Sequence, residues 1–224
     1  MEYRSSPITV PPARRIRLVR SSPPARSGVS DGSGGGPHSI ACAALLPRRV
    51  IAAASIASPA PVDAEGLEWT AGMGHENVDE LAAFRAGESE LEAFLEQKVE
   101  QMVGTTAEQV VAALGDLVSD VDRRALSGEF ADFIVRQTNH ALASGVWGWF
   151  DDDGAFLRDW GFDLDGICVP LSVWHGGQDT FVPVAHGEWL AARLGADPHI
   201  RAGDGHLSLS LSSYGEILDT LLEH

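Results

Sequence analysis

The stretch ICVPLSVWHGGQDTFVPVAHGEWLAARLG, residues 167–195, is the part of the sequence that decides the fold. ICVPLSVWHG (167–176) is an apolar run with Pro170 near its start, which predicts a buried strand. GGQDTFVP follows as a turn, and HGEWLAARLG (186–195) has the pattern of an amphipathic helix that ends at a glycine. PHIRAGDGH (198–206) then predicts a short strand and loop before a closing helix. This repetition of strand, loop and helix predicts a parallel sheet covered by helices.

The sequence on the amino-terminal side continues the same pattern. SIACAALL (39–46), which Pro47 ends, predicts a buried helix, and VIAAASIAS (50–58) is a short apolar run that predicts a buried strand. RSGVSDG (26–32) is not apolar, and we expect no strand there. Because Pro47 and two arginines divide residues 39–57, neither half approaches the ~20 apolar residues of a membrane span, and we expect no membrane segment.

A helical and acidic segment occupies residues 60–165 and carries no strand signal. Residues 79–103 place apolar side chains at spacings of mostly three and four, which predicts helical structure with a break at Gly87. Residues 107–122 and 131–150 each predict one further helix. The sequence therefore predicts an α/β protein in which a helical segment is inserted between strands of a parallel sheet.

The net charge divides the chain into two unequal parts. The chain of 224 residues carries a formal net charge of -16, but residues 51–224 alone hold 30 acidic and 8 basic residues. Because nucleic acids and anionic membranes are polyanions, we do not expect so acidic a protein to bind either of them. The two cysteines, Cys42 and Cys168, form no disulfide framework, which favours a reducing, cytoplasmic compartment.

Residues 1–31 differ in composition from the rest and are rich in Arg, Pro and Ser. The Arg and Ser bias is that of a targeting peptide, but Glu2 and the prolines suit an amphipathic helix poorly. A twin-arginine signal would need a longer apolar stretch after Arg14 and Arg15. The composition favours a disordered segment over both alternatives.

Ser33 is the first candidate for a chemical role. It lies among glycines in GSGGG, immediately before the helix predicted from residue 39. A sharp strand-to-helix turn needs such small neighbours, and it would expose the hydroxyl over the helix amino terminus, where the N–H of Gly34 could stabilise an oxyanion. A flexible Gly/Ser loop and an anion-binding turn are the alternative interpretations.

Asp179 and His206 are the other two candidates. Asp179 follows the strand LSVWH, in the place where active sites of α/β sheets gather, although an aspartate in a turn or a helix cap would look the same. His206 lies in the glycine-flanked loop GDGHLSL, where it could act as a general base or be an ordinary surface histidine. The order Ser33, Asp179, His206 is the order of an α/β-hydrolase triad.

Three segments, SGGGPHSIACAALLPRRV, WGFDLDGICVPLSVWHGGQDTFVPVAHGEWLAARL and GDGHLSL, resemble α/β-hydrolases of the proline-iminopeptidase-like and esterase-like group. The resemblance covers about residues 32–224. It implies Ser33 as the nucleophile, His206 as the base, Asp179 as the residue that orients this histidine, and Gly34 as one oxyanion donor.

The resemblance also implies a domain organisation. Residues 32–59 and 166–224 would form the α/β-hydrolase core, and residues 60–165 a helical cap, or lid. The fold normally places about five strands up to the nucleophile and an HG-type loop that gives a second oxyanion N–H, and the residues before Ser33 are too few for them. In addition, Asp31 stands where the G-x-S-x-G motif has its first glycine. We therefore expect an incomplete parallel sheet in an N-terminally truncated chain that lacks activity alone.

The expected function is that of a serine hydrolase that cleaves an ester or amide bond of a small molecule through an acyl-enzyme, without a cofactor. A non-catalytic α/β-hydrolase-like binding or assembly module is the alternative, because an exposed sheet edge needs a partner. A phosphate-binding domain that uses GSGGG is a less favoured hypothesis, because no Walker lysine follows this segment. The sequence specifies neither the substrate nor whether the chain forms a homo-oligomer.

The remaining polar residues are given structural roles. Residues 151–153 are interpreted as a solvated acidic run, and His175 and His186 as structural histidines beside the Asp179 loop. The eight histidines show no zinc-ligand spacing, and we expect no metal.

Overall fold

A computed structural model describes residues 26–104, 106, 108–109, 112 and 114–224. Residues 1–25, which hold most of the Arg- and Pro-rich segment, lie outside the described residues. The strands are β1 (Ser27–Gly32), β2 (Val50–Ile56), β3 (Leu171–Gly176) and β4 (Asp197–Arg201). The helices are α1 (Gly36–Leu45), α2 (His75–Ala86), α3 (Glu88–Met102), α5 (Asp120–Ala125), α6 (Gly128–Ala141), α7 (Trp147–Phe156), α8 (Val184–Leu194) and α9 (Ser208–Leu222). Short 3₁₀ turns are η1 (Ser33–Gly35), η2 (Gly115–Leu117), η3 (Leu142–Ser144) and η4 (Leu164–Gly166).

The four strands form one sheet in the order β1-β2-β3-β4, and every neighbouring pair is parallel. Because every neighbouring pair is parallel, each connection returns to the start of the next strand. All four carboxyl ends therefore lie at the same edge of the sheet. The predicted parallel sheet with flanking helices is confirmed.

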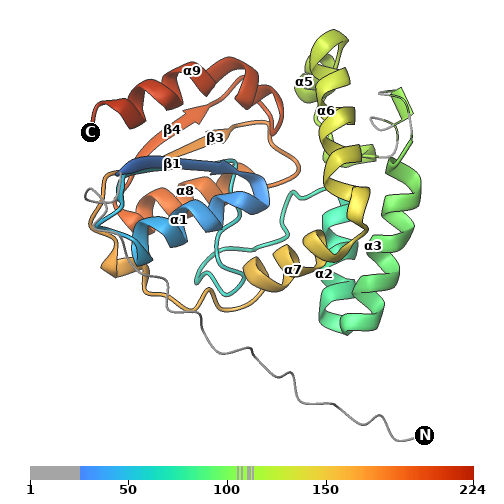
Figure 1. Ribbon diagram of the computed structural model, residues 1–224, viewed down its shortest axis with the longest axis horizontal. Helices are drawn as coiled ribbons and strands as arrows, with labels where there is room; N and C mark the ends of the chain where they lie inside the picture. The colour runs from blue at the N-terminus through green and yellow to red at the C-terminus, as the bar shows by residue number, and fades with distance from the viewer. Residues whose placement is uncertain (1–25, 105, 107, 110–111, 113) are drawn as a thin grey trace, which may run out of the picture.

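Helices cover both faces of the sheet (Figure 1). On one face the side chains of Ala54, Ile56 and Trp174 pack against Leu209 and Ile217 of α9. On the other face, α1 and α8 meet the alternate strand residues, and clusters there join Ile40 to Val173 and Leu190, and Ala43 to Val50 and Ala53. Strands buried on both faces read as continuous apolar runs, which explains why VIAAASI and LSVWHG are recognisable in the sequence.

The helices α2, α3, α5, α6 and α7 gather on one side of the sheet and its three covering helices (Figure 1). They all lie between β2 and β3 in the chain, so they form an insertion at the carboxyl edge of the sheet. We call this set the helical insertion. Leu91 and Leu95 of α3 and Val146 form its own buried cluster.

The strand β1 corrects one expectation, because the segment 26–32 was expected to hold no strand. Ser27–Gly32 is a strand despite its polar sequence, and it pairs in parallel with β2 through partners such as Val29 with Ala53 and Gly32 with Ile56. The backbone ladder to an apolar neighbour outweighs the weak strand propensity of SGVSDG. Residues 27–31 thus belong to the sheet and not to the atypical N-terminal segment.

One expected helix boundary is confirmed, and one expected helix is divided. The break predicted at Gly87 is confirmed, since α2 ends at Ala86 and α3 begins at Glu88. The single helix expected over 131–150 is instead α6, η3 and the start of α7, divided at Gly145, whose φ of +90° interrupts helical geometry.

The region 107–122 was also expected to be one helix. Within its described residues, η2 and the start of α5 are separate elements, and Ser119 caps α5 by accepting the Asp122 N–H. Five positions, 105, 107, 110, 111 and 113, lie outside the described residues. Over the described part of the chain, no helix is both long enough and apolar enough to span a membrane.

The packing of α9 yields a stability prediction. Ile217 is fully buried against the sheet, whereas Leu222 on the same helix is 81% exposed. Truncation of a buried isoleucine leaves a cavity, so we expect Ile217→Ala to lower the free energy of unfolding by about 2–5 kcal/mol. Leu222→Ala is the matched control and should change it by less than about 0.5 kcal/mol. Urea denaturation measures both, and similar losses in the two variants would contradict the assigned orientation of α9.

Candidate active site

Ser33 stands at the turn between β1 and α1, at the carboxyl edge of the sheet. Its φ is +54°, in the left-handed region that residues with a side chain rarely adopt. Strain of this kind costs about 1–3 kcal/mol and is maintained only where the surrounding structure enforces it. Gly34 follows as the second residue of η1. The turn thus places the Ser33 side chain next to the backbone of Gly34 at the carboxyl edge of the sheet.

Asp31 stands where the motif has its first glycine, and the structure shows how its side chain is accommodated. Its Oδ1 accepts the Gly32 N–H at 2.8 Å, and its carboxyl group lies against Gly35. A Cβ at residue 35 would be only 2.4 Å from the Asp31 Cγ atom, which no side chain permits. The absence of a side chain at Gly35 therefore makes room for the aspartate at the position where the motif has its first glycine.

Asp179 and His206 meet across two loops, each at the carboxyl end of a strand. The Nδ1 atom of His206 lies 2.8 Å from Oδ2 of Asp179, and Oδ1 of Asp179 accepts the Val182 N–H at 2.8 Å. Both residues are buried. The Phe181 ring stacks on the imidazole with centroids 4.6 Å apart. The aspartate thus fixes the ring orientation and directs the Nδ1 proton, which leaves Nε2 for proton transfer.

The two carboxylates near His206 decide its protonation. Burial by itself lowers the pKa of His206, but the adjacent Asp179, through its charge and its hydrogen bond, and the more distant charge of Asp122 outweigh burial and raise the pKa above its usual value. The imidazolium form is thereby stabilised, as a general base needs once it has accepted a proton.

His175 and His186 take structural positions, as the sequence predicted. Nε2 of His175 contacts the Val182 carbonyl at 2.7 Å, and burial lowers the pKa of this histidine. In His186, Nδ1 accepts the Ala60 N–H at 3.1 Å and Nε2 donates to the Trp69 carbonyl at 2.8 Å, while burial lowers its pKa to about 4. Both histidines are therefore neutral supports for the loops around the site.

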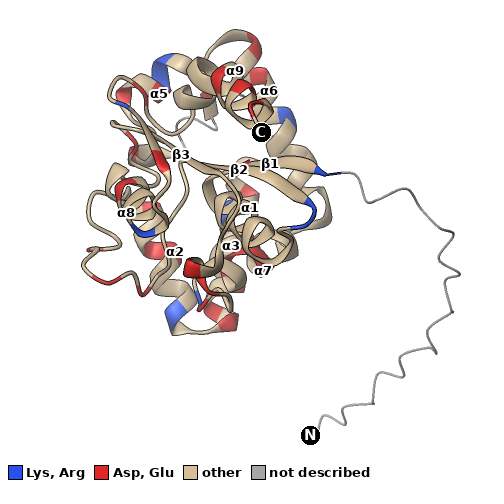
Figure 2. Cartoon of the chain, turned by 90° about the vertical axis from the view of Figure 1, so that its left-hand side faces the viewer, with Lys and Arg blue, Asp and Glu red and all other residues tan. Residues whose placement is uncertain are grey.

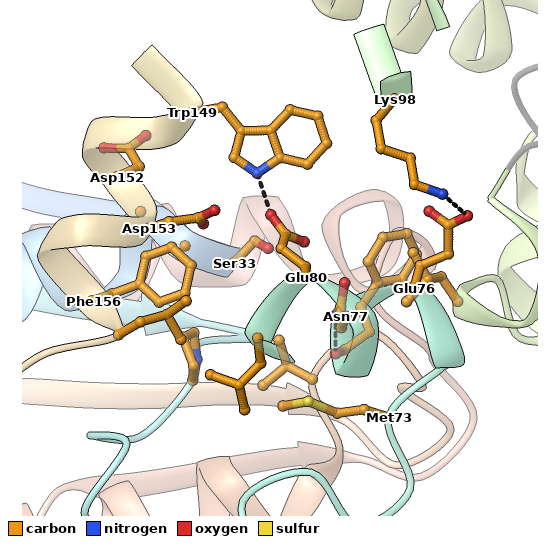
Figure 3. A pocket seen from close by; sticks show the side chains of 18 of the residues that line it. Ser33, Met73, Glu76, Asn77, Glu80, Lys98, Trp149, Asp152, Asp153 and Phe156 are labelled. Carbon is orange, nitrogen blue, oxygen red and sulfur yellow. Dashed lines mark hydrogen bonds and ion pairs between the residues drawn. The ribbon is translucent and has the colours of Figure 1, made fainter. Parts of the chain in front are cut away.

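A cavity of about 460 Å³ lies between the Ser33 turn and the helical insertion (Figure 3). The core contributes the turn Gly32–Gly35 and the side chains of Phe181 and Val182. The insertion contributes mainly apolar and aromatic side chains: Met73, Leu81, Phe94, Met102, Leu114, Leu117, Trp149, Phe156 and Leu157. The cavity thus has the size and apolar lining of a small-molecule site.

Two carboxyl groups of the insertion face each other in this cavity, Glu80 from α2 and Asp153 from α7 (Figure 3). Trp149 donates its Nε1–H to Glu80. Burial raises the pKa of Glu80, and burial together with the charge of Glu80 raises the pKa of Asp153 to about 9. Because two ionised carboxylates repel each other in a buried site, the pair retains a proton at neutral pH.

Asp153 corrects the interpretation of residues 151–153 as a solvated acidic run. Asp151 and Asp152 are exposed, but Asp153 is only 1% exposed. The three residues lie on helix α7, where successive side chains point about 100° apart, so one of a run of three faces the interior. The sequence signal was present in the aromatic neighbours of the run, Trp149 and Phe156, which line the same cavity.

Negative charge dominates the site and the surface. Among the described lining residues, Lys98 is the one basic side chain, and its ammonium group pairs with Glu76. Acidic segments are spread over the helices of both parts of the molecule, whereas basic segments are sparse (Figure 2). In the part of the chain that the structure describes, no three His, Cys, Asp or Glu side chains are grouped so that they could hold a metal ion.

The structure brings the three candidate residues to one edge of the sheet, but it does not join them all. Asp179 and His206 are hydrogen-bonded, and Ser33 lines the cavity. Within the described residues, Ser33 and His206 form no hydrogen bond. Such contacts are often long in unliganded sites and tighten when a substrate binds. Gly34, the predicted oxyanion donor, lies beside Ser33 in the cavity wall.

The chain has the α/β-hydrolase fold, which comparison with solved structures shows. It superposes on a bromoperoxidase from Bacillus anthracis with a TM-score of 0.56 and 18% identity, over 90% of this chain and 68% of the other. For the enol-lactonase from Burkholderia xenovorans LB400, the TM-score is 0.52 at 18% identity, with 89% and 66% of the two chains covered. An α/β hydrolase fold protein from Nakamurella multipartita gives a TM-score of 0.50 at 24% identity, with 88% and 69% covered.

The chain thus spans about two thirds of the length of these similar structures. No protein-family model matches the sequence, and no curated protein matches it either. At these identities the likeness establishes the fold, and function in such folds depends on the residues of the site.

The buried carboxyl pair predicts a stability change with pH. Because the pKa of Asp153 is raised to about 9 in the folded chain, the folded state holds a proton that the unfolded state releases above pH 3.8, and stability falls as pH rises between these values. We expect Asp153→Asn to remove this pH-dependent loss of stability. The melting temperature of the variant should then exceed that of the wild type by a margin that grows from pH 5 to pH 9, at about 2–4 °C for each kcal/mol of stability that the wild type loses. Asp151→Asn on the exposed face is the control. Melting curves that respond alike in both variants would contradict the proton-sharing pair.

Proposed function

We propose that the protein is a serine hydrolase that cleaves an ester or amide bond through an acyl-enzyme. The observation that carries the proposal is the strained Ser33, held at φ +54° at the sheet edge where the hydrogen-bonded pair Asp179–His206 also lies. A strained serine between a strand and a helix, facing a cavity, has the features of a nucleophile elbow.

The proposed reaction assigns one role to each residue. His206 accepts the Ser33 proton at Nε2 while Ser33 Oγ attacks the carbonyl carbon, and the negative charge develops on the carbonyl oxygen next to the Gly34 N–H. The imidazolium then gives its proton to the leaving alcohol or amine as the bond to carbon breaks. Water then attacks the acyl carbon while His206 takes its proton, the bond from this carbon to Ser33 Oγ breaks, and the imidazolium returns the proton to Oγ as the acid leaves. Asp179 holds the imidazole in the productive tautomer throughout.

The cavity supports an apolar, uncharged acyl group. Its lining is mainly aromatic and aliphatic. Its charged groups are the Glu80–Asp153 pair, the paired Lys98 and Glu76, and the exposed Asp152. An anionic acyl group would face a proton-sharing carboxyl pair with no free cation among the described lining residues, and its desolvation would not be compensated. A neutral chain of a few carbons avoids this penalty and buries apolar surface.

A non-catalytic binding or assembly module is the second candidate. One observation favours it: within the described residues β1 pairs on one side only, with β2, so the strand that carries Ser33 is an edge strand with free backbone groups. In this case the strain at Ser33 would serve only the packing of the turn.

Covalent labelling of the 224-residue chain separates the two candidates. A fluorophosphonate should add one adduct at Ser33, detected by mass spectrometry, and p-nitrophenyl butanoate is the matching neutral substrate. Ser33→Ala should abolish labelling and lower any esterase kcat by at least about 10³-fold. Ser30→Ala on the same strand is the control and should be labelled normally.

The outcomes are distinct. Labelling that depends on Ser33 supports the hydrolase, and ester turnover with it would contradict the expectation that the chain lacks activity alone. A folded chain that is not labelled overturns the proposal in favour of the non-catalytic module.

The pH dependence of labelling tests the role of His206. Because Asp179 and Asp122 raise its pKa above 6.5, the rate of Ser33 labelling should rise with pH around a midpoint above 6.5, as the imidazole becomes neutral. Asp179→Asn removes the larger of the two carboxylate effects while burial persists, so the midpoint should move down. His38→Gln, on the surface of α1, is the control. A midpoint that Asp179→Asn leaves in place would exclude His206 as the titrating base.

A further inference from the structure

Asp122 of the helical insertion is fully buried, and its carboxylate contacts the loop that carries His206. The two residues are 84 positions apart in the sequence. The oxygens of Asp122 accept five hydrogen bonds: from the backbone N–H groups of His206 at 2.8 Å, Leu207 at 3.0 Å and Ser208 at 2.8 Å, and from the hydroxyls of Ser208 at 2.8 Å and Ser119 at 2.9 Å.

These donors belong to the amino terminus of α9. The first N–H groups of a helix have no partner within it, and Leu207, at the cap position, offers no side-chain acceptor. A carboxylate satisfies several such donors at once and also interacts favourably with the helix dipole. The cap that α9 lacks in its own sequence therefore comes from α5.

The backbone at Gly205 approaches Asp122 and Ser119 closely. A Cβ at residue 205 would lie 2.3 Å from Oδ2 of Asp122 and 2.5 Å from Oγ of Ser119, so the loop can approach the carboxylate only because residue 205 is glycine. Ser119 in turn caps α5 by accepting the Asp122 N–H and donates its hydroxyl to the carboxylate. The carboxylate is thus held from both sides.

We propose that Asp122 is a positioning residue that fixes the backbone at His206 and so makes the placement of this histidine depend on the seating of the helical insertion. Its oxygens contact the loop backbone and not the imidazole, so it acts through His206. The proposal rests on the proposed hydrolase function for its kinetic consequence, but its structural consequence can be tested without it.

A purely structural role for Asp122 would destabilise the chain without affecting the histidine selectively. The groups that face His206 are Asp179 and Phe181 from the loop after β3, Asp122 from α5, and the more distant His175 from β3. If Asp122 positions the loop, its loss alters the contact between His206 and Asp179, and the titration of His206 reports this change together with the loss of the Asp122 charge. Ser119→Ala keeps the charge and removes one hydrogen bond to the carboxylate, so a shift of the His206 titration in that variant reports positioning alone.

The test compares Asp122→Asn with Asp120→Asn, an exposed acidic neighbour on the same helix. The Asn amide can accept at one oxygen only and places an N–H₂ group against the loop donors. We expect kcat for p-nitrophenyl butanoate, or the rate of fluorophosphonate labelling, to fall about 10- to 100-fold with KM nearly unchanged. The pKa of His206, followed by NMR, should fall in Asp122→Asn and stay in place in Asp120→Asn.

Each outcome of this comparison either supports or overturns the positioning role of Asp122. Wild-type kinetics and an unchanged His206 titration in a folded Asp122→Asn chain would overturn the proposal. If Asp122→Asn does not fold, Ser119→Ala, which removes one donor and keeps the carboxylate, should show a smaller change in the same direction, and no change overturns it. Failure of the proposed function is distinct, because a wild-type chain without labelling or turnover still reports on Asp122 through the His206 titration.

Discussion

The parallel pairing of β1 with β2 is the constraint on which the site depends. It extends the sheet by one polar strand and places the end of that strand at the same edge as the ends of β3 and β4. Ser33 therefore emerges beside the loops of Asp179 and His206, although the three residues are distant in the sequence. Without this ladder, SGVSDG would have no reason to be extended, and the strained turn at Ser33 would have no fixed base.

Two pairs of buried carboxyl groups respond to burial in opposite ways. Asp179 and Asp122 are matched by donors, and the charge of each favours the protonated form of His206. Glu80 and Asp153 face each other in the cavity, where Lys98 pairs with Glu76, and burial raises the pKa of both. Burial removes all four carboxyl groups from water. Hydrogen bonds compensate for this loss at Asp179 and Asp122, whereas the Glu80–Asp153 pair compensates for it by retaining a proton.

Polar contacts join the helical insertion to the core. The buried clusters of α3 and of the sheet are separate, whereas Asp122 spans from α5 to the start of α9. Thr180 and Asn77 add hydrogen bonds between the loop after β3 and the insertion. The insertion thus lines the cavity and also contacts the loop that carries His206. A shift of the insertion would therefore change both the cavity and the position of this histidine.

The sequence by itself determined the parallel sheet, the helices that cover it and the loops of Asp179 and His206, because strands buried on both faces leave continuous apolar runs. It also marked Ser33 through its glycine neighbours. Only the tertiary structure decided that SGVSDG is a strand, that Asp153 is buried and that Asp122 caps a helix 86 residues away. Each of these depends on a partner supplied by a distant segment, and the free energy of such a contact leaves no periodicity or spacing in the local sequence.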